Sequence, residues 1–236
     1  MFKRPHHQIV ASVLADMDAR FLRATNCYFG GGTAISMLMG EFRESVDMDF
    51  LCSDQEGYRV LRESVFDRGM SAIIPSGVEV LRELRADRDG IRAVLLKNGV
   101  PIKFEIVREA RITLSPDEQD TIPVPCLSRT DLFAEKLLAN ADRFADRSVM
   151  SRDAIDLLMM TSVWREIPEA AWKKAAGAYG KSVFDAWEKA KALLQQNGYL
   201  EECAHKMGIS REDTDRIAFA LNAELAPITR RDTARP

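Results

Sequence analysis

Three consecutive glycines at residues 30–32 limit the local structure of this chain to a tight turn. They follow a strand-like run at residues 27–29 and precede residues 33–39, which have the composition of a short helix. Glycines adopt unusual backbone angles and let another group approach the main chain closely. A helix start also offers free N–H groups and the positive end of the helix dipole, which together favour a phosphate. The triplet therefore predicts a strand, a turn and a helix start suited to binding phosphate.

Two aspartates lie on the strand expected at residues 46–52. Alternation puts Asp47 and Asp49 on one face of this strand and Met48 and Phe50 on the other. Two neighbouring carboxylates repel each other unless a cation lies between them. Mg²⁺ (or Mn²⁺) meets that need, because it binds through carboxylates and substrate phosphates. Either a glycine turn or an Asp-x-Asp pair alone would be ordinary, but their succession predicts a metal-dependent site.

A third carboxylate, Glu105, is expected to complete this site. Lys103 and Glu105 alternate with apolar residues, so they share the polar face of a strand that could lie beside the Asp47 strand. Glu79 and Glu83 remain alternatives if the strands are arranged differently.

The predicted secondary structure changes character near residue 125. Apolar residues at a four-residue spacing predict a helix over residues 5–23, and a second helix is expected over 54–68. Further strands are expected at residues 78–84, 91–96 and 101–107, with the Asn98-Gly99 pair marking a hairpin. Prolines keep residues 122–125 extended. Beyond them, helices are expected from about residues 128, 152, 169, 181 and 211, with a polar, mobile tail at 227–236.

These patterns predict an α+β fold with two domains. Residues 1–125 would form a mixed-sheet core, and residues 126–236 an all-helical domain that completes the active-site cleft. Ser128 and Asp131 are expected to form a capping box at the first helix of the second domain.

Composition excludes several classes of protein. The net charge is -3, so the chain has no overall basic character that would announce nucleic-acid binding. No apolar stretch approaches the length of a membrane span, and no signal peptide is expected. The four cysteines form no CxxC pair, which favours reduced, buried cysteines in a cytoplasmic protein over a zinc site. His6 and His7 are expected to be exposed to solvent.

The run Gly-Gly-Thr-Ala, followed by Arg43, Ser45, Asp47, Asp49 and Phe50, resembles the first motif of the AbiEii/AbiGii toxin family of nucleotidyltransferases, within the polymerase-β-like superfamily. The glycine-to-Asp47 spacing is slightly long for that superfamily. The resemblance implies Mg²⁺ at the two aspartates and Glu105 as the third carboxylate, either a metal ligand or the group that activates the acceptor. The residues it implies in nucleotide binding are Gly31, Gly32, Thr33, Arg43, Ser45, Lys136 and Arg143. For Arg43, an ion pair with Asp47 or Asp49 is the alternative.

Two later motifs of this family have counterparts here. Lys136 and Arg143 match its Lys-x6-Lys pattern, with arginine in place of the second lysine, and Asp153 and Asp156 match its Asp-x-x-Asp pattern. We expect Lys136 to be an exposed lysine that reaches the triphosphate and contributes little to folding. The alternatives are a solvated stripe for the basic pair, Asp153 in a helix start capped by Ser151, and Asp156 as an ion-pair partner of Lys136 or Arg143.

The function implied by the resemblance is transfer of a nucleoside monophosphate from an NTP to an acceptor. The acceptor would be an RNA such as tRNA, or a protein, and the chain would be the toxin of a toxin–antitoxin or phage-defence pair with a cognate antitoxin. The alternatives are a non-catalytic nucleotide- or partner-binding module and an antibiotic-modifying or metabolic nucleotidyltransferase. An RNA-binding rim is expected at Arg129, Lys136, Arg143, Arg147 and Arg152, unless these residues pair with Asp142, Asp146 and Asp153.

Overall fold

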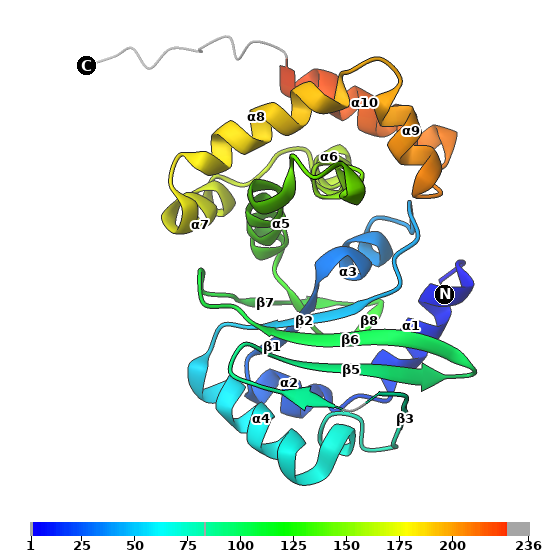
Figure 1. Ribbon diagram of the computed structural model, residues 1–236, viewed down its shortest axis with the longest axis vertical. Coiled ribbons are helices and arrows are strands. Elements are labelled where there is room, and N and C mark those ends of the chain that lie inside the picture. The colour runs from blue at the N-terminus through cyan, green and yellow to red at the C-terminus, as the bar shows by residue number, and fades with distance from the viewer. Residues whose placement is uncertain (1, 83, 226–236) are drawn as a thin grey trace.

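The computed structural model describes residues 2–82 and 84–225 of the chain. A mixed sheet lies in the middle of the molecule, with helices on both of its faces (Figure 1). The α+β fold expected from the sequence is confirmed. The tail expected to be mobile, residues 227–236, lies outside the described residues.

The sheet combines parallel and antiparallel strands in the order β3-β5-β6-β2-β1-β8-β7, with β4 paired to β5. β2 is antiparallel to β1 on one side and parallel to β6 on the other, so it occupies the centre of the sheet. The strands are β1 (Cys27–Gly30), β2 (Met48–Cys52), β3 (Glu79–Val80), β4 (Arg85–Ala86), β5 (Gly90–Lys97), β6 (Val100–Arg108), β7 (Pro116–Gln119) and β8 (Ile122–Leu127).

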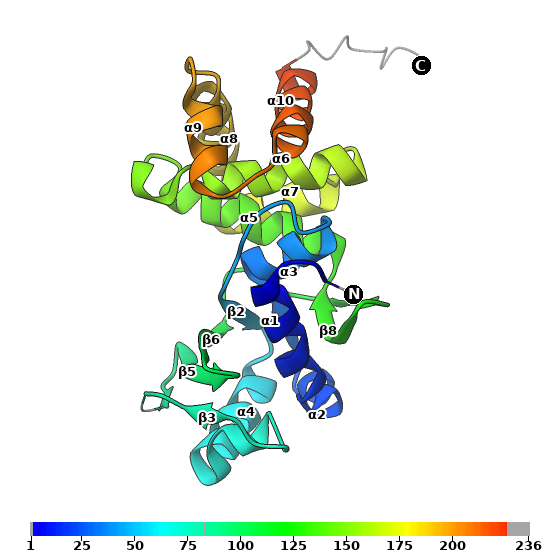
Figure 2. The ribbon, with the colours of Figure 1, turned by 90° about the vertical axis from the view of Figure 1, so that its right-hand side faces the viewer.

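Three helices, α1, α2 and α4, cover one face of the sheet, and the others form a layer beyond the opposite face (Figures 1 and 2). The first group is α1 (Pro5–Ala15), α2 (Ala19–Ala24) and α4 (Gln55–Arg68). The second is α3 (Gly31–Leu38), α5 (Arg129–Arg143), α6 (Arg152–Trp164), α7 (Glu169–Tyr179), α8 (Ser182–Leu194), α9 (Tyr199–Lys206) and α10 (Arg211–Leu225).

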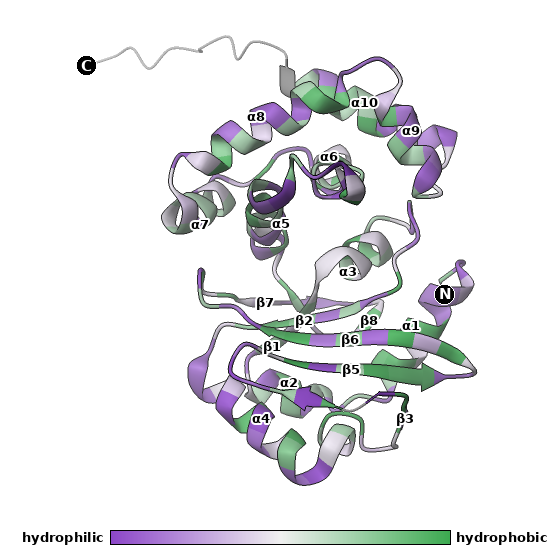
Figure 3. Ribbon diagram, viewed as in Figure 1, coloured by the Kyte–Doolittle hydropathy of each residue, from purple (hydrophilic) through white to green (hydrophobic). Residues whose placement is uncertain are grey.

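Strand alternation divides the apolar residues between two cores. Phe29, Phe50 and Phe104 from three adjacent strands stack on the α1, α2 and α4 side, with ring centroids 5.3 and 5.7 Å apart. Apolar and polar residues alternate along β6 (Figure 3), so the face of β6 that is turned away from this core carries polar side chains. Leu51 points to the other core, and Asp49, two residues before it, therefore faces the same side.

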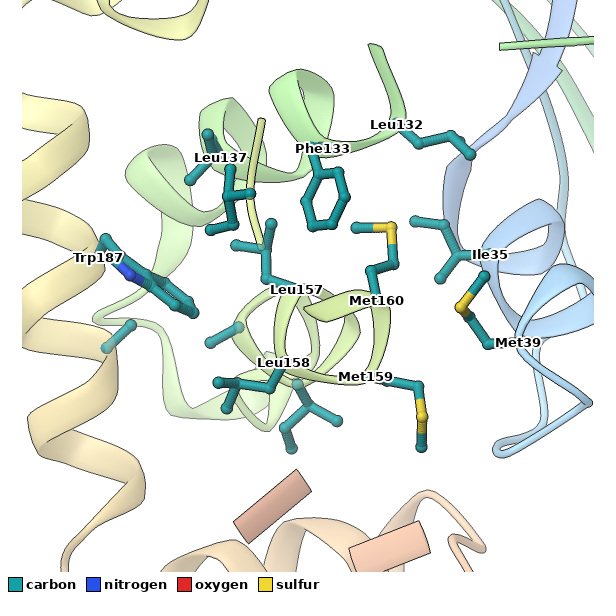
Figure 4. Packing of buried hydrophobic residues seen from close by; sticks show 14 of the residues in the cluster. Ile35, Met39, Leu132, Phe133, Leu137, Leu157, Leu158, Met159, Met160 and Trp187 are labelled. Atoms are coloured by element: carbon teal, nitrogen blue, oxygen red, sulfur yellow. The ribbon is translucent and has the colours of Figure 1, made fainter. Parts of the chain in front are cut away.

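The second core joins α3 to the helical layer. Ile35 and Met39 from the α3 region pack against Met160 of α6 and Leu132 and Phe133 of α5 (Figure 4). Burying such side chains stabilises the fold by about 1.5–3 kcal/mol each. The helix that leaves the glycine turn is thus held by the helical layer.

Several expected elements are confirmed and two are wrong. The Asn98-Gly99 hairpin joins β5 and β6, and Ser128 Oγ accepts from the Asp131 amide as expected of a cap. The single helix over residues 5–23 is wrong, because Asp18 accepts from the Phe21 amide and starts a separate helix α2. The strand over 78–84 is also wrong: only Glu79–Val80 pairs with β5, and residue 83 is not described.

The β7–β8 hairpin extends the sheet further than expected. Residues 122–125 are extended as predicted, and they belong to β8, which pairs with β1 in the centre of the sheet. β7 was not foreseen, because its Pro-Asp-Glu-Gln sequence carries no apolar alternation.

The cysteines are free and buried, as expected. The expected exposure of His7 is wrong: it is fully buried, and its Nδ1 lies 2.9 Å from Glu41 Oε1. His6 is partly buried. In the part of the chain that the structure describes, no helix has the length and apolar character needed to cross a membrane.

Two helical glycines provide a test of this packing. A Cβ on Gly57 in α4 would lie 2.1 Å from the Thr25 carbonyl oxygen, whereas a Cβ on Gly177 in α7 would meet nothing within 4 Å. We predict that Gly57→Ala lowers the free energy of unfolding by about 1–3 kcal/mol through overpacking. Gly177→Ala, the matched control, should raise it by about 0.5–1 kcal/mol. Urea denaturation of both variants checks the prediction, and equal stability of the two would contradict it.

Candidate active site

A cavity of about 260 Å³ lies between the sheet and α5. It brings together most of the residues singled out in the sequence. Those that line it are Gly31, Gly32, Arg43, Ser45, Asp47, Asp49, Lys136 and Arg143. Thr33, Glu105, Asp153 and Asp156 lie around the cavity but do not line it.

The glycine turn lets two side chains approach the backbone. Gly31 has a φ of +69°, and a Cβ on it would lie 2.5 Å from Asp49 Oδ2. A Cβ on Gly32 would lie 2.5 Å from Arg43 Nη2. Helix α3 begins at Gly31, two residues earlier than expected, and no side chain caps it. Its first N–H groups are therefore available to a ligand.

Thr33 and Ser45 connect this turn to the aspartate strand. Thr33 is fully buried, and its hydroxyl lies 2.9 Å from Ser45 Oγ and contacts the Asp47 carbonyl oxygen. Thr33 thus stabilises the backbone of Asp47 through a hydrogen bond, whereas Ser45 lines the cavity.

Asp47 and Asp49 form an uncompensated pair of carboxylates. Both are half-buried, and neither carboxylate has a hydrogen-bond or ion-pair partner among residues 2–82 and 84–225. Burial and the nearby charge of Asp47 raise the pKa of Asp49 above its usual value. Such a pair fits a divalent cation, which would remove the repulsion and take its other ligands from water or phosphate.

Glu105 lies beside this pair, on the neighbouring strand. β2 and β6 are parallel with Asp49 opposite Glu105, so the two side chains share one face of the sheet. Glu105 Oε1 accepts from Arg92 Nε at 2.6 Å, and Oε2 lies 3.8 Å from Lys103 Nζ. No group of three or more His, Cys, Asp or Glu residues in the described chain is arranged to hold a metal ion as the side chains stand. Glu79, the alternative, lies on β3, which β5 and β6 separate from β2.

A chain of alternating charges, buried except for Arg143 at its end, forms the wall opposite the aspartates. Asp156 Oδ1 accepts from Arg43 Nε at 2.7 Å, and its Oδ2 lies 2.7 Å from Lys136 Nζ. Lys136 Nζ also donates to Asp153 at 2.9 Å, and Arg143 Nε donates to Asp153 at 2.5 Å. Burial alone would raise the pKa values of Asp153 and Asp156, but the neighbouring cations lower both below their usual range. All five groups are therefore ionised at neutral pH.

These contacts correct three expectations. Arg43 pairs with Asp156 of α6, not with Asp47 or Asp49. Lys136 is not an exposed lysine: only 6% of its surface is accessible to solvent, because α6 packs against α5 at this point. Ser151 makes no side-chain cap at the start of α6, because its backbone is in the left-handed region and its Oγ lies 3.3 Å from the Tyr199 hydroxyl.

Only part of the expected basic rim borders the cavity. Arg129 donates to the carbonyl oxygens of Trp164 and Glu166, and Arg147 donates to Gln196 Oε1. Arg143 pairs with Asp153, as the alternative proposed. Arg152 lines the cavity, is exposed, and has no ion-pair partner in the described part of the chain.

Sequence reasoning missed a second polar group in the cavity wall. Glu109, Arg111 and Glu135 line it, with Arg111 Nη2 2.6 Å from Glu109 Oε2 and 3.3 Å from Glu135 Oε2. A helical-spacing signal was present for α5, because Leu132, Ala139 and Arg143 share the face of Lys136, and Glu135 is adjacent to it. No comparable signal marked Glu109 and Arg111, which follow the end of β6.

The family model described as "Nucleotidyl transferase AbiEii toxin, Type IV TA system" matches residues 12–234 of the chain. No curated protein sequence matches this chain. Among solved structures, an antigenic nucleotidyltransferase-like protein from Paracoccidioides brasiliensis is similar, with 17% identity, a TM-score of 0.51, and coverage of 90% of this chain and 98% of that one. JHP933 from Helicobacter pylori has 18% identity, a TM-score of 0.48, and coverage of 95% and 97%. The first of these supports the same fold.

The buried charges predict a large stability effect at Lys136. Lys136→Ala leaves the buried carboxylates Asp153 and Asp156 with fewer cationic partners, so we predict a loss of about 3–5 kcal/mol in the free energy of unfolding. Lys173→Ala is the matched control, because that exposed lysine on α7 pairs with the exposed Glu169, and such a surface pair contributes little. Chemical denaturation measures both. Equal stability of the two variants would contradict the prediction.

Proposed function

The chain belongs to the AbiEii family of nucleotidyl transferase toxins, and from that premise we propose that it transfers a nucleoside monophosphate from an NTP to an acceptor. In this reaction, an acceptor hydroxyl oxygen attacks the α-phosphorus. The bond from that phosphorus to the bridging oxygen breaks, and pyrophosphate leaves.

The observation that carries this proposal is the opposition of two charged walls across one cavity. Asp47 and Asp49 lie on the sheet side without cationic partners, and Lys136 and Arg143 lie on α5. Asp47 and Asp49 would hold Mg²⁺, which would neutralise charge on the transferring phosphoryl group. The cationic wall and the open N–H groups of α3 would bind the triphosphate.

Each remaining residue has a distinct part in this proposal. Gly31 and Gly32 leave room for Asp49 and Arg43 beside the phosphates, and Ser45 adds a hydroxyl to the cavity wall. Asp153 and Asp156 orient Lys136, Arg143 and Arg43. Glu105 is the third carboxylate, beside Asp49, and either joins the metal site or accepts the proton of the attacking hydroxyl.

The rival functions are less well supported. A non-catalytic binding module would not need two adjacent carboxylates without partners, since their repulsion destabilises the fold. Family membership favours a toxin, paired with an antitoxin and acting in the cytoplasm, over an antibiotic-modifying or metabolic enzyme.

The carboxylate pair provides the direct test. We predict that Asp49→Asn lowers nucleotide transfer roughly a thousandfold, because several kcal/mol of charge stabilisation depends on the bound cation. The raised pKa of Asp49 means that its ionised form is disfavoured in the folded protein. The variant should therefore melt at the same or a higher temperature than the unsubstituted chain in EDTA at pH 7.

Mg²⁺ separates this role from a structural one. It should raise the melting temperature of the unsubstituted chain and leave that of Asp49→Asn unchanged. Asp67→Asn, an exposed acid on α4, is the control and should behave like the unsubstituted chain in both assays. Transfer by Asp49→Asn at the unsubstituted rate would refute the proposed function.

We further propose that the acceptor is an RNA such as tRNA, bound in part by Arg152 at the mouth of the cavity. This arginine is exposed and free to neutralise a phosphate, so its removal should weaken RNA binding and make the salt slope shallower by about one. Arg147→Ala is the control, because Arg147 points to Gln196.

Labelling with each radiolabelled NTP and total tRNA, combined with filter binding across a salt series, measures this effect. Label on RNA with the expected change for Arg152→Ala would support an RNA acceptor. Label on protein alone would refute the RNA acceptor and leave nucleotidyl transfer in place.

A further inference from the structure

A fully buried carboxyl oxygen in the cavity wall, Oε1 of Glu135, has no hydrogen-bond partner among the described residues. Glu135 extends from α5, and its side chain is 13% exposed. Its Oε2 lies 3.3 Å from Arg111 Nη2, but its Oε1 is buried and meets no hydrogen-bond partner in the described residues. A buried polar atom without a partner is costly to a fold, and it is relieved when a ligand supplies the missing contact.

The neighbours of Glu135, Arg111 and Glu109, already have hydrogen-bond partners. Arg111 donates to both oxygens of Glu109, and its other nitrogens contact Asp142 at 3.3 Å and the Tyr179 hydroxyl at 3.1 Å. Glu109 also accepts from the Arg111 amide at 2.5 Å. Glu135 Oε1 thus has no donor from Arg111 and lies free to contact a ligand, with the Glu109 carboxyl as its competitor within the cluster.

Glu135 lies beside Lys136, at the opposite end of the cationic wall from Arg143. It precedes Arg143 by eight positions on α5, which corresponds to about 12 Å along the helix axis. On the sheet side, the Glu109 amide donates to the Cys52 carbonyl oxygen, three residues beyond Asp49 on β2 and hence about 10 Å along that strand. A nucleotide with its triphosphate beside Arg143 would extend its base towards Glu135.

Part of the cavity wall near Glu135 is apolar. Leu51 and Val107 are neighbours across β2 and β6, and both line the cavity on the sheet side. Leu132 of α5 lines it on the helical side. A planar base fits between apolar side chains of this kind. A macromolecular acceptor fits less well at this end of the cavity, because the charge of Glu109 would repel its phosphates.

We propose that Glu135 binds the edge of the nucleobase of the NTP and thereby determines which base the enzyme accepts. This inference rests on the proposed function, which requires that the cavity binds an NTP. It adds a specificity-determining residue outside the matched motifs.

The protonation state of Glu135 defines the contact. Burial and the charge of Glu109 raise the pKa of Glu135 to about 8, so the carboxyl group is neutral at pH 7. Because Oε2 lies next to Arg111, a proton on Oε1 can be donated to the neighbouring Glu109 carboxylate or, when a nucleotide is bound, to a ring nitrogen or carbonyl oxygen of the base. The charged or titratable groups facing it are Glu109 and Arg111 after β6, Asp131, Lys136 and Asp142 on α5, and Tyr179 on α7.

Binding of α,β-methylene analogues of ATP, GTP, CTP and UTP, with Mg²⁺ present, tests this inference between pH 6.5 and 9. For the preferred analogue, Glu135→Ala should lose about tenfold in affinity, the loss of one buried hydrogen bond. The differences among the four analogues should also shrink. Glu135→Gln keeps a donor N–H, so it should bind within about threefold of the unsubstituted chain.

The pH profile separates recognition from a structural role. Affinity of the unsubstituted chain should be constant below pH 7 and fall as the pH rises through about 8, because the neutral carboxyl is the donor. Glu135→Gln should show no such fall. Asp142→Asn is the matched control: it removes another acidic partner of Arg111 that does not line the cavity, so the profile and base preference should be retained.

The outcomes are distinct. Unchanged affinity and base preference in Glu135→Ala, or equal loss for all four analogues, would overturn this inference and leave the proposed function intact. If the folded, unsubstituted chain binds none of the analogues, the proposed function fails and this inference fails with it. Thermal melts of each variant establish that it is folded.

Discussion

The buried ion-pair chain of Arg43, Asp156, Lys136, Asp153 and Arg143 holds the cavity together. Arg43 comes from the segment between α3 and β2, and its partner Asp156 lies 113 residues later on α6. Burying each charge without a partner would cost several kcal/mol, so every member restricts the positions of the others. Because Arg43 Nη2 also approaches the backbone at Gly32, the same contacts fix the glycine turn relative to α5 and α6. Charge pairing between distant parts of the sequence therefore sets the position of the glycine turn relative to these helices in the structure.

Local patterns were enough to predict the sheet side of this site. Alternation placed Asp49 away from Phe50, and the polar face of β6 placed Glu105 beside β2, as the register shows. These predictions succeeded because a strand repeats every two residues and buries one face in a core. The glycine turn could also be predicted from the sequence, since a close approach of other groups to the backbone requires glycine. Whether these residues have the chemical roles expected of them remains a prediction.

The helical side was less predictable, for a physical reason. A spacing of seven shows that Lys136 and Arg143 share a helical face, but it does not show what covers that face. The packing of α6 against α5 buries Lys136 and brings its ammonium group into contact with Asp153 and Asp156. These contacts depend on tertiary structure, so the local sequence does not reveal them. The same limit applies to Glu135 and Arg111, whose contact joins α5 to the segment after β6. β7 escaped prediction because backbone pairing with β8 holds a strand with an exposed polar sequence.

The distribution of charge explains why neither wall of the cavity can act alone. Three cations and two carboxylates in the buried chain leave an excess of one positive charge, which is small beside a triphosphate. Asp47 and Asp49 add two negative charges across the cavity, so a nucleotide without a cation would meet repulsion there. A divalent cation held by the aspartates would remove that repulsion and let the weakly cationic wall contribute to nucleotide binding. In the proposed function, metal and nucleotide would therefore favour each other's binding in this cavity, because each would compensate a charge that the protein leaves exposed to the other.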